Sequence, residues 1–379
     1  MKTKFALDLT WVRHKIVGGT EFFVNNLIQG FLDTDYDFEI TFLTALDNNY
    51  LFGKYTSDDR IKILKTPVKS SLVARRIIWQ NLFLSRLLIK NNIFLCLEPV
   101  YSKPILGTRK IKFVTVIHDL EALHYPENHS FITNLWLRIS WYNSVKTSKH
   151  IISISDFVKK DILSKYNIRE FKVTTIFDPV IINIEEHVEF KKISSKYCIE
   201  KGNYYYTVSK LNIHKNLTTL IKTFGEIKKN KISNIPCKLV ISGVNGGMKE
   251  QLLKIAEEYS ILDEIVLTGF VDNSVRNTLY TNAKAFLFPS IFEGFGMPPI
   301  EAICSNTPVI TTKMACIPEI TQNIANYVEN PYSPDDWIYS MINMHNKNHL
   351  FDKDRYLPKN IAKKYISVLK KVQFGVKDD

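Results

Sequence analysis

Cysteine is scarce in this 379-residue sequence, and its five copies are scattered as Cys96, Cys198, Cys237, Cys304 and Cys316. No two of them have the C-x2-C spacing of a structural zinc site, and an odd number does not make a disulfide framework. Reduced, buried thiols in a protein of the reducing cytosol are therefore expected.

Long hydrophobic runs are also missing, since none reaches the roughly 18–20 residues that a membrane-spanning helix needs. The basic start at Met1–Lys4 is followed by only three apolar residues before Asp8, so no secretory signal is visible. These features predict a soluble cytoplasmic protein that can still touch the inner face of the membrane.

Glycine and proline are few, at 14 each, and neither recurs with a period. No repeat of 20–50 residues is visible, which argues against a solenoid or a propeller. The composition, 45% hydrophobic and 23% charged, is that of an ordinary globular protein. At about 100–200 residues per domain, the length indicates two domains.

Acidic residues are outnumbered, with 38 Asp and Glu against 50 Lys and Arg, which gives a net charge of +12. A basic protein of this kind can bind nucleic acid, anionic lipid or a phosphorylated small molecule. Nucleic acid is the weakest of the three, because no recognition motif appears.

Short apolar runs alternate with amphipathic ones in two successive series. The first series contains Phe5–Leu9, Glu21–Leu32, Phe38–Leu43, Ile111–Ile117 and His150–Ser155. The second contains Tyr204–Val208, Leu217–Lys228, Lys238–Gly243, Met248–Tyr259, Ile265–Phe270, Ala285–Phe288 and Pro308–Thr311. Strand, helix and strand in succession predict crossover connections and parallel sheets, hence two doubly wound, Rossmann-like α/β domains facing a central cleft.

A polar linker at Val180–Gly202 separates the two series. We expect an N-terminal domain at residues 1–190 and a C-terminal domain at 191–355. Residues 356–379 contain an amphipathic basic helix, Pro358–Lys371, which is predicted to pack back on the N-terminal domain.

The stretch from Phe288 to Ala302 has the strongest chemical signal. Glu293 and Glu301 lie eight residues apart, on either side of a Gly-Phe-Gly-Met-Pro-Pro turn that enters a helix. Glycines there let backbone N–H groups approach an anion, and the helix N-terminus favours negative charge. Glu293 can accept hydrogen bonds from sugar hydroxyls, and Glu301, on the first turn, from a ribose diol. Alternatively, Glu293 caps the helix and Glu301 complements its dipole.

This stretch, Ser-x-x-Glu-Gly-Phe-Gly-x-Pro-Pro-x-Glu-Ala, closely resembles the E-x7-E signature of retaining family-4 glycosyltransferases of the GT-B fold. Three further stretches match in order: Gly18-Gly19-Thr20-Glu21, Val114–Leu120 with His118, and Tyr206–Asn216 with Lys215. The family usually has Gly-Arg where this chain has Ser209-Lys210. The likeness covers roughly residues 1–340.

The resemblance implies transfer of a hexose with retention and without a metal or cofactor. The donor is a nucleotide-diphosphate sugar, GDP-mannose or a UDP-sugar, held by the C-terminal domain. The acceptor is a saccharide or lipid-linked saccharide of O-antigen or other surface-polysaccharide assembly, held by the N-terminal domain. The implied catalytic residues are His118, Glu293, Lys215 and Lys210, and the implied donor-binding residues are Gly18, Gly19, Ser209, Gly294, Phe295, Gly296, Met297 and Glu301.

Other functions stay open at this point. A nucleotide-sugar epimerase, a phosphorylase or a non-catalytic nucleotide-sugar-binding subunit could share the fold. The D-x-D patterns within Asp33–Asp37 resemble a metal signature, but their place between a helix and a strand indicates a solvated loop. No G-x-S-x-G supports a hydrolase, and Ser155 is interpreted as a helix cap.

Residues 65–90 combine basic and apolar side chains. A helix from about Ser71 to Lys90 would be amphipathic, with Arg75 and Arg76 on its basic flank. It either covers the core or settles on anionic lipid with Trp79 at the interface.

Overall fold

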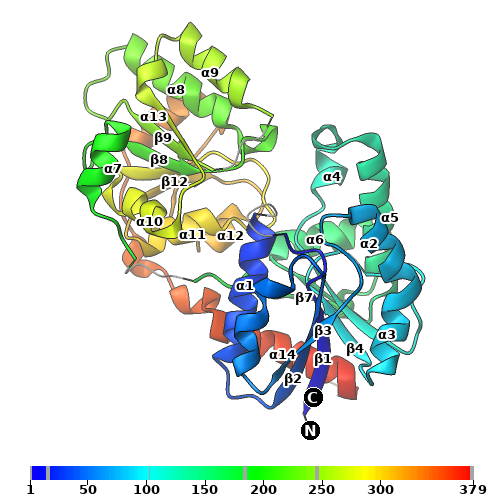
Figure 1. Ribbon diagram of the computed structural model, residues 1–379. Helices are drawn as coiled ribbons and strands as arrows, with labels where there is room; N and C mark the ends of the chain where they lie inside the picture. The colour runs from blue at the N-terminus through cyan, green and yellow to red at the C-terminus, as the bar shows by residue number, and fades with distance from the viewer. Residues whose placement is uncertain (1, 14–17, 102, 182–185, 244–246, 376–379) are drawn as a thin grey trace. The chain divides into compact units, whose positions relative to one another are not determined.

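The computed structural model describes residues 2–13, 18–101, 103–181, 186–243 and 247–375 (Figure 1). The chain forms two compact units: Met1–Ile181 with Asp354–Asp379, here called unit 1, and Ile182–Lys353, called unit 2. The predicted domain boundaries are at residues 190 and 355. Residues 182–185 of the expected linker lie outside the described ones, while α7 (Phe190–Tyr197), also within that stretch, is a helix of unit 2.

Unit 1 is built on a seven-stranded parallel sheet in the order β3-β2-β1-β4-β5-β6-β7. Its strands are β1 (Thr3–Asp8), β2 (Phe38–Thr44), β3 (Ile61–Lys65), β4 (Leu95–Glu98), β5 (Lys112–Ile117), β6 (His150–Ser153) and β7 (Val173–Thr175). Its helices are α1 (Gly19–Leu32), α2 (Val73–Trp79), α3 (Ser85–Lys90), α4 (Glu121–His124), α5 (Phe131–Thr147), α6 (Asp156–Lys165) and α14 (Pro358–Phe374). A π-helical turn, Gln80–Leu84, joins α2 to α3.

Helix α14, at the far end of the sequence, lies against α1 and the sheet of unit 1 (Figure 1). Its apolar face, which includes Ile361, Tyr365 and Leu369, is fully buried. The two helices approach so closely at Gly30 that a Cβ there would lie 2.2 Å from the carbonyl oxygen of Pro358. The last helix of the chain thus completes the core of the first unit.

Unit 2 is built on a six-stranded parallel sheet in the order β10-β9-β8-β11-β12-β13. Its strands are β8 (Tyr205–Val208), β9 (Leu239–Ser242), β10 (Ile265–Gly269), β11 (Ala285–Phe288), β12 (Val309–Thr312) and β13 (Asn326–Val328). Besides α7, its helices are α8 (Leu217–Lys229), α9 (Lys249–Glu258), α10 (Asn273–Asn282), α11 (Met297–Cys304), α12 (Ile317–Ile320) and α13 (Pro334–Ile342).

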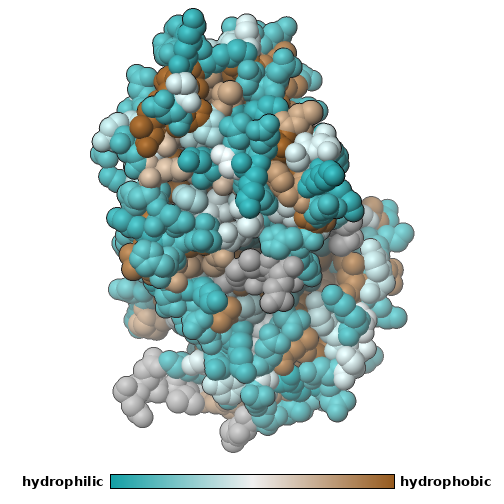
Figure 2. Space-filling model, turned by 90° about the vertical axis from the view of Figure 1, so that its left-hand side faces the viewer, coloured by the Kyte–Doolittle hydropathy of each residue, from teal (hydrophilic) through white to brown (hydrophobic). Residues whose placement is uncertain are grey.

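Both faces of the unit 2 sheet are covered, as a doubly wound sheet requires. Tyr205 packs with the apolar side chains of α8, α9 and α13 on one face. Tyr204 and Tyr206, which alternate with it, pack with those of α7, α10, α11 and α12 on the other. The view in Figure 2 shows mainly hydrophilic side chains, with the hydrophobic ones in small separate groups.

The predicted α/β fold with two parallel sheets is confirmed, and most predicted elements lie within two residues of the observed ones. The short strands β3, β4, β7 and β13 were not predicted. The expectation for the cysteines is wrong in part: all five are free, but Cys198 and Cys237 are exposed and Cys304 is only partly buried. The predicted helix from Ser71 to Lys90 contains the π turn, and Arg76 is buried rather than on a solvated flank.

Candidate functional site

The candidate site in unit 2 lies where the strand order reverses. Strands β8 and β11 are neighbours, but the chain leaves β8 towards β9 on one side and β11 towards β12 on the other. At such a switch point the two loops diverge and leave a crevice at the carboxyl ends of the strands. The loop after β8 carries Ser209, Lys210 and Lys215, and the loop after β11 carries Glu293. Topology therefore brings two predicted stretches, far apart in sequence, to one edge of the sheet.

Hydrogen bonds fasten these two loops to each other. The backbone N–H of Ile291 donates to the carbonyl of His214 at 2.9 Å, and the Ser290 hydroxyl donates to the same carbonyl at 3.3 Å. Lys215 Nζ lies 2.6 Å from Glu293 Oε1, and both side chains are largely buried. Two predicted catalytic residues thus form an ion pair, which fixes the direction in which each side chain points.

Ser209 and Lys210 lie at the carboxyl end of β8. The N–H of Ser209 donates to the carbonyl of Ser242, and a Cβ at Gly243 would lie 1.9 Å from the carbonyl oxygen of Ser209. This close approach requires glycine at residue 243, where φ is +141°. Lys210 is exposed, and among the residues that the structure describes it has no ion-pair partner. Its ammonium group is available to a ligand at this edge.

The turn from Glu293 to Gly296 leads into α11. Gly296 has φ +92° and precedes Met297, the first residue of the helix, while Phe295 is buried. The thiol of Cys316 donates to the carbonyls of Glu293 (3.2 Å) and Phe295 (2.9 Å). Burial raises the pKa of Cys316 well above its usual value, so the sulfur keeps the proton that it donates. This contact holds the turn and was missed by the sequence analysis.

Glu301 lies in the second turn of α11, not in its first as the sequence analysis expected. The alternatives of a helix-dipole role for Glu301 and a capping role for Glu293 therefore do not apply, because Gly296 is the N-cap and no side chain caps this helix. Glu301 Oε1 lies 3.2 Å from Arg276 Nη2, and the Tyr280 hydroxyl donates to Glu301 Oε2 at 3.1 Å.

Arg276 and Tyr280, which the sequence analysis missed, lie one turn apart on α10. Burial lowers the pKa of Arg276, but Glu301, Tyr280 and Tyr206 together raise it above the usual value, so the arginine is charged. Each oxygen of the Glu301 carboxylate thus has one partner and further lone pairs for a ligand. The spacing i, i+4 was the one available signal, and it is too common to identify a site.

In unit 1, His118 follows β5 directly and is partly buried. Its Nε2 lies 2.8 Å from the carbonyl oxygen of Pro99, and its ring contacts Phe23 edge-on with centroids 4.7 Å apart. Because a carbonyl only accepts, Nε2 carries the proton and Nδ1 presents a lone pair. Burial lowers the pKa of His118, against the smaller effects of Pro99 and Asp119, so the neutral form is favoured.

Gly18 and Gly19 open helix α1 in unit 1. Gly18 is the N-cap with φ +73°, no side chain caps the helix, and the Gly18 carbonyl accepts from the N–H groups of Glu21 and Phe22. Among the described residues, no side chain caps this helix N-terminus, which suits an anion site. Contact of Gly18 and Gly19 with a donor stays a prediction.

The geometry of the D-x-D patterns within Asp33–Asp37 does not support a metal site. Asp35 is fully exposed and lies within 3.9 Å of Lys359, and Asp33 ends helix α1. Within the described ranges, no group of three or more His, Cys, Asp or Glu could hold a metal ion. Ser155 caps α6 by accepting from the N–H of Val158, as predicted.

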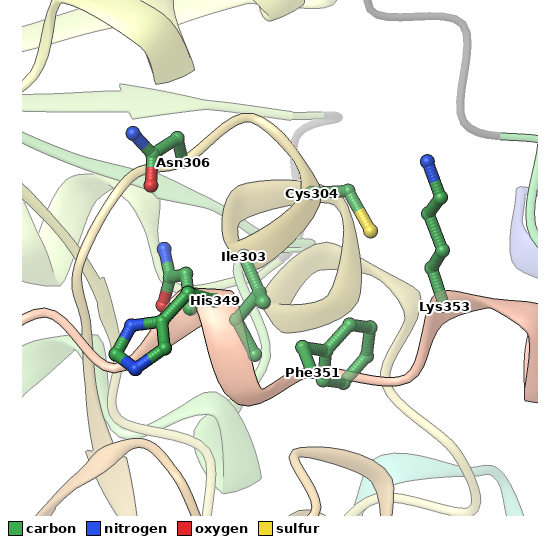
Figure 3. Close-up of a pocket in the computed structure, with 7 residues that line it drawn as sticks. Ile303, Cys304, Asn306, His349, Phe351 and Lys353 are labelled. Atoms are coloured by element: carbon green, nitrogen blue, oxygen red, sulfur yellow. The ribbon is translucent and has the colours of Figure 1, made fainter.

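A separate cavity of about 220 Å³ lies in unit 2 at the end of α11 (Figure 3). It contains none of the predicted site residues and is smaller than the usual ligand pocket of about 300–1,000 Å³. Burial raises the pKa of its Cys304 to about 12, so this thiol is not a nucleophile at neutral pH. The cavity is lined by Ile303, Cys304, Asn306, Asn348, His349, Phe351 and Lys353.

Comparison with known proteins adds independent findings. Residues 189–364 match the family model described as "Glycosyl transferases group 1". The chain is 32% identical over 221 residues to O-antigen chain mannosyltransferase RfbU of Salmonella typhimurium. The matched region covers 58% of this chain and 57% of that relative. The chain is 25% identical over 224 residues to O-antigen chain mannosyltransferase B of Escherichia coli, with 59% and 58% covered. The match thus spans less than two thirds of either relative.

Solved structures of similar fold cover nearly the whole chain. HepE of Anabaena, in complex with UDP and glucose, has a TM-score of 0.64 at 15% identity and covers 97% of this chain and 95% of that one. Sucrose-phosphate synthase from Thermosynechococcus elongatus has a TM-score of 0.73 at 14% identity, with 99% and 100% covered. These likenesses confirm the predicted GT-B fold. No helix in the described part of the chain has the length and apolar character needed to cross a membrane.

Proposed function

We propose that the protein is a retaining, metal-independent glycosyltransferase, because residues 189–364 match the family model of the glycosyl transferases group 1. It moves a hexose from a nucleotide-diphosphate sugar, GDP-mannose or a UDP-sugar, to a saccharide or lipid-linked saccharide acceptor. The observation that carries the proposal is the arrangement at the switch point of unit 2, where Lys215, Glu293 and Glu301 project from two adjoining loops and a helix.

The donor is held by groups whose chemistry matches its parts. Lys210 and Lys215 supply positive charge for the diphosphate, and the turn at Gly294–Gly296 supplies backbone N–H groups. Glu301, fixed by Arg276 and Tyr280, accepts hydrogen bonds from the ribose hydroxyls. Glu293, fixed by Lys215, accepts them from the transferred sugar.

The reaction requires stabilisation of the leaving group. The acceptor hydroxyl oxygen forms a bond to the anomeric carbon while the bond from that carbon to the phosphate oxygen breaks. The acceptor proton passes to the departing phosphate on the same face. Lys210 and Lys215 offset the negative charge that develops there, where a different class of enzyme uses a divalent cation. Neutral His118 accepts a hydrogen bond from the sugar at Nδ1 and orients it.

The comparisons favour a role in surface-polysaccharide assembly. Both curated relatives described above are O-antigen chain mannosyltransferases, so mannose is the first sugar to test. HepE was solved with UDP, which keeps a UDP-sugar as the second donor.

A thermal-unfolding panel with UDP, GDP, ADP, CDP and dTDP tests the donor site. A nucleotide at 100 times its dissociation constant should stabilise the parent protein by about 2.7 kcal/mol. Glu301→Ala should remove this gain, because it deletes the proposed ribose acceptor. Glu258→Ala, at an exposed glutamate of the same unit, is the matched control and should keep it. If none of the five nucleotides raised the unfolding temperature of the parent protein, the donor assignment would be contradicted.

A further inference from the structure

Unit 1 has a switch point of its own, between β1 and β4. Strand β1 ends at Asp8 and β4 ends at Glu98, and both carboxylates are fully buried. Open α/β sheets bind their ligands outside the strand ends at such a point. Apart from the donor contact predicted for Gly18 and Gly19, in the loop that follows β1, no ligand is assigned to this position.

The carboxylate of Asp8 already accepts three hydrogen bonds. Its Oδ1 accepts from the backbone N–H of Thr10 at 2.9 Å and from the Thr10 hydroxyl at 2.6 Å. Its Oδ2 accepts from Gln80 Nε2 at 2.6 Å. Asp8 therefore shapes the rim of the switch point and offers little to a further cation.

Arg76, on α2, lies close enough to Asp8 and Glu98 for both carboxylates to act on its pKa. Arg76 is only 9% exposed, and its Nε is buried without a hydrogen-bond partner. Across the described ranges, the guanidinium makes no hydrogen bond and no ion pair within 4 Å. Burial lowers its pKa, Asp8, Tyr101 and Glu98 act in the opposite direction, and Arg13 lowers the pKa further. The carboxylates of Asp8 and Glu98 thus raise the pKa of Arg76, but neither forms an ion pair with it.

A buried arginine without a partner is costly. Desolvation of a charge is compensated in proteins by an ion pair or by hydrogen bonds, and leaving a charge buried and unpaired costs several kcal/mol. A guanidinium has five N–H donors in a fork that matches a carboxylate or phosphate group. Unused donors at a ligand-binding edge are explained when the partner is a ligand.

We propose that Arg76 binds an anionic oxygen group of the acceptor, such as its phosphate or diphosphate, at the switch point of unit 1. The identification of this ligand as the acceptor rests on the proposed function. Acidic sugars offer the same chemistry through a carboxylate. Arg75, the neighbouring residue, is exposed. The two arginines, which were both predicted on the basic flank of one helix, therefore have different roles.

Equilibrium dialysis with labelled pyrophosphate and, separately, glucuronate tests the site on the full chain. Arg76→Met is compared with Arg75→Met, which removes the same charge one residue away. The diphosphate site of unit 2 is intact in both variants, so only their difference matters. We expect Arg76→Met to bind one equivalent of pyrophosphate fewer than Arg75→Met. Loss with glucuronate alone would identify a carboxylate ligand, and equal binding of both probes by both variants would overturn the proposal.

Stability gives a second readout. Arg76→Met should unfold at the same temperature as the parent protein or higher, because an uncompensated charge has been removed. A variant that fails to fold would contradict the proposal, since it would show that Arg76 supports the structure. Arg76→Lys should still bind pyrophosphate, about tenfold more weakly, because it retains the charge without the fork; unchanged affinity would count against the geometry.

The outcome is independent of the donor site. Arg76→Met should keep the nucleotide response of the parent protein in the thermal panel. If no nucleotide stabilises the parent protein but Arg76→Met binds less pyrophosphate, the proposed function is overturned and the anion site stands. If a nucleotide stabilises the parent protein but Arg76→Met and Arg75→Met bind both probes equally, the proposed function stands without the anion site.

Discussion

His118 has its protonation state set by its surroundings. Its Nε2 proton is held by the carbonyl of Pro99, and burial lowers the pKa of the ring below the usual value of 6.5. The residue is therefore suited to accept a hydrogen bond at neutral pH and unsuited to act as an acid.

We expect His118 to make the protein less stable in mild acid. Between the lowered pKa of the folded state and 6.5, the unfolded chain binds a proton that the folded chain does not. Stability therefore falls as the pH falls below about 6.5, and the loss is complete below the folded pKa. His118→Asn should flatten this dependence in urea unfolding at pH 7.5, 6.5 and 5.5. His345→Asn, at an exposed histidine of unit 2, is the control. Parallel curves for His118→Asn and parent would refute the assignment.

A second variant at this residue, His118→Ala, tests the role of the side chain in the reaction. His118→Ala should spare nucleotide binding, since the nucleotide groups proposed here lie in unit 2, and should reduce sugar transfer. Transfer at the parent rate would show that His118 does not orient the sugar.

At the scale of elements, the contact between α1 and α14 holds unit 1 together. Gly30→Ala adds a methyl group 2.2 Å from the carbonyl oxygen of Pro358 and 3.1 Å from the Cβ of Ala362. The first contact is with backbone, so the helices must separate. Overpacking of this kind costs about 1–3 kcal/mol, which outweighs the roughly 1 kcal/mol by which alanine favours a helix.

Urea unfolding measures this cost directly. We expect a lower midpoint for Gly30→Ala and an unchanged one for Gly53→Ala, where a Cβ meets nothing within 4 Å. Equal stability of Gly30→Ala and the parent protein would show that α14 packs more loosely than the structure has it.

The alternation of apolar strands and amphipathic helices was enough to predict the parallel sheets, because strands buried on both faces are apolar almost throughout. Strand β3 was missed because it has basic residues at Lys62 and Lys65 and is an edge strand. Glu293 and Lys215 could be proposed from local motifs. Their mutual contact could not, because it depends on strand order.

Contacts between distant residues also explain what the sequence could not show about Arg276, Cys316 and Arg76. Each is an ordinary residue in its local pattern. Arg276 and Cys316 have their partners on other elements, and the burial of Arg76 depends on how α2 packs. Arg75 and Arg76 are identical neighbours, and only the fold shows that one is exposed and the other buried.

At the scale of the molecule, the net charge of +12 favours contact with an anionic surface. Five cations of residues 65–90 are exposed: Lys65, Lys69, Arg75, Arg86 and Lys90. Large apolar side chains between them are exposed as well, including Ile78 at 58% and Leu82 at 48%. Of the two alternatives, Trp79 fits the one in which the helix covers the core, since it packs against the core of unit 1. The exposed cations and apolar side chains fit a surface that rests on anionic lipid through Ile78 and Leu82 rather than through Trp79.

Co-sedimentation with vesicles containing phosphatidylglycerol tests this membrane contact. Each cation near an anionic surface contributes about 1 kcal/mol, so Arg86→Glu with Lys90→Glu should weaken vesicle binding more than tenfold. Lys249→Glu with Lys254→Glu, at exposed lysines of α9, makes the same change in net charge and should bind nearly as the parent protein does. Binding should fall as salt is raised, because screening shortens the reach of each charge. Equal binding by the two double variants would mean that net charge alone attracts the protein, and that residues 65–90 form no membrane surface.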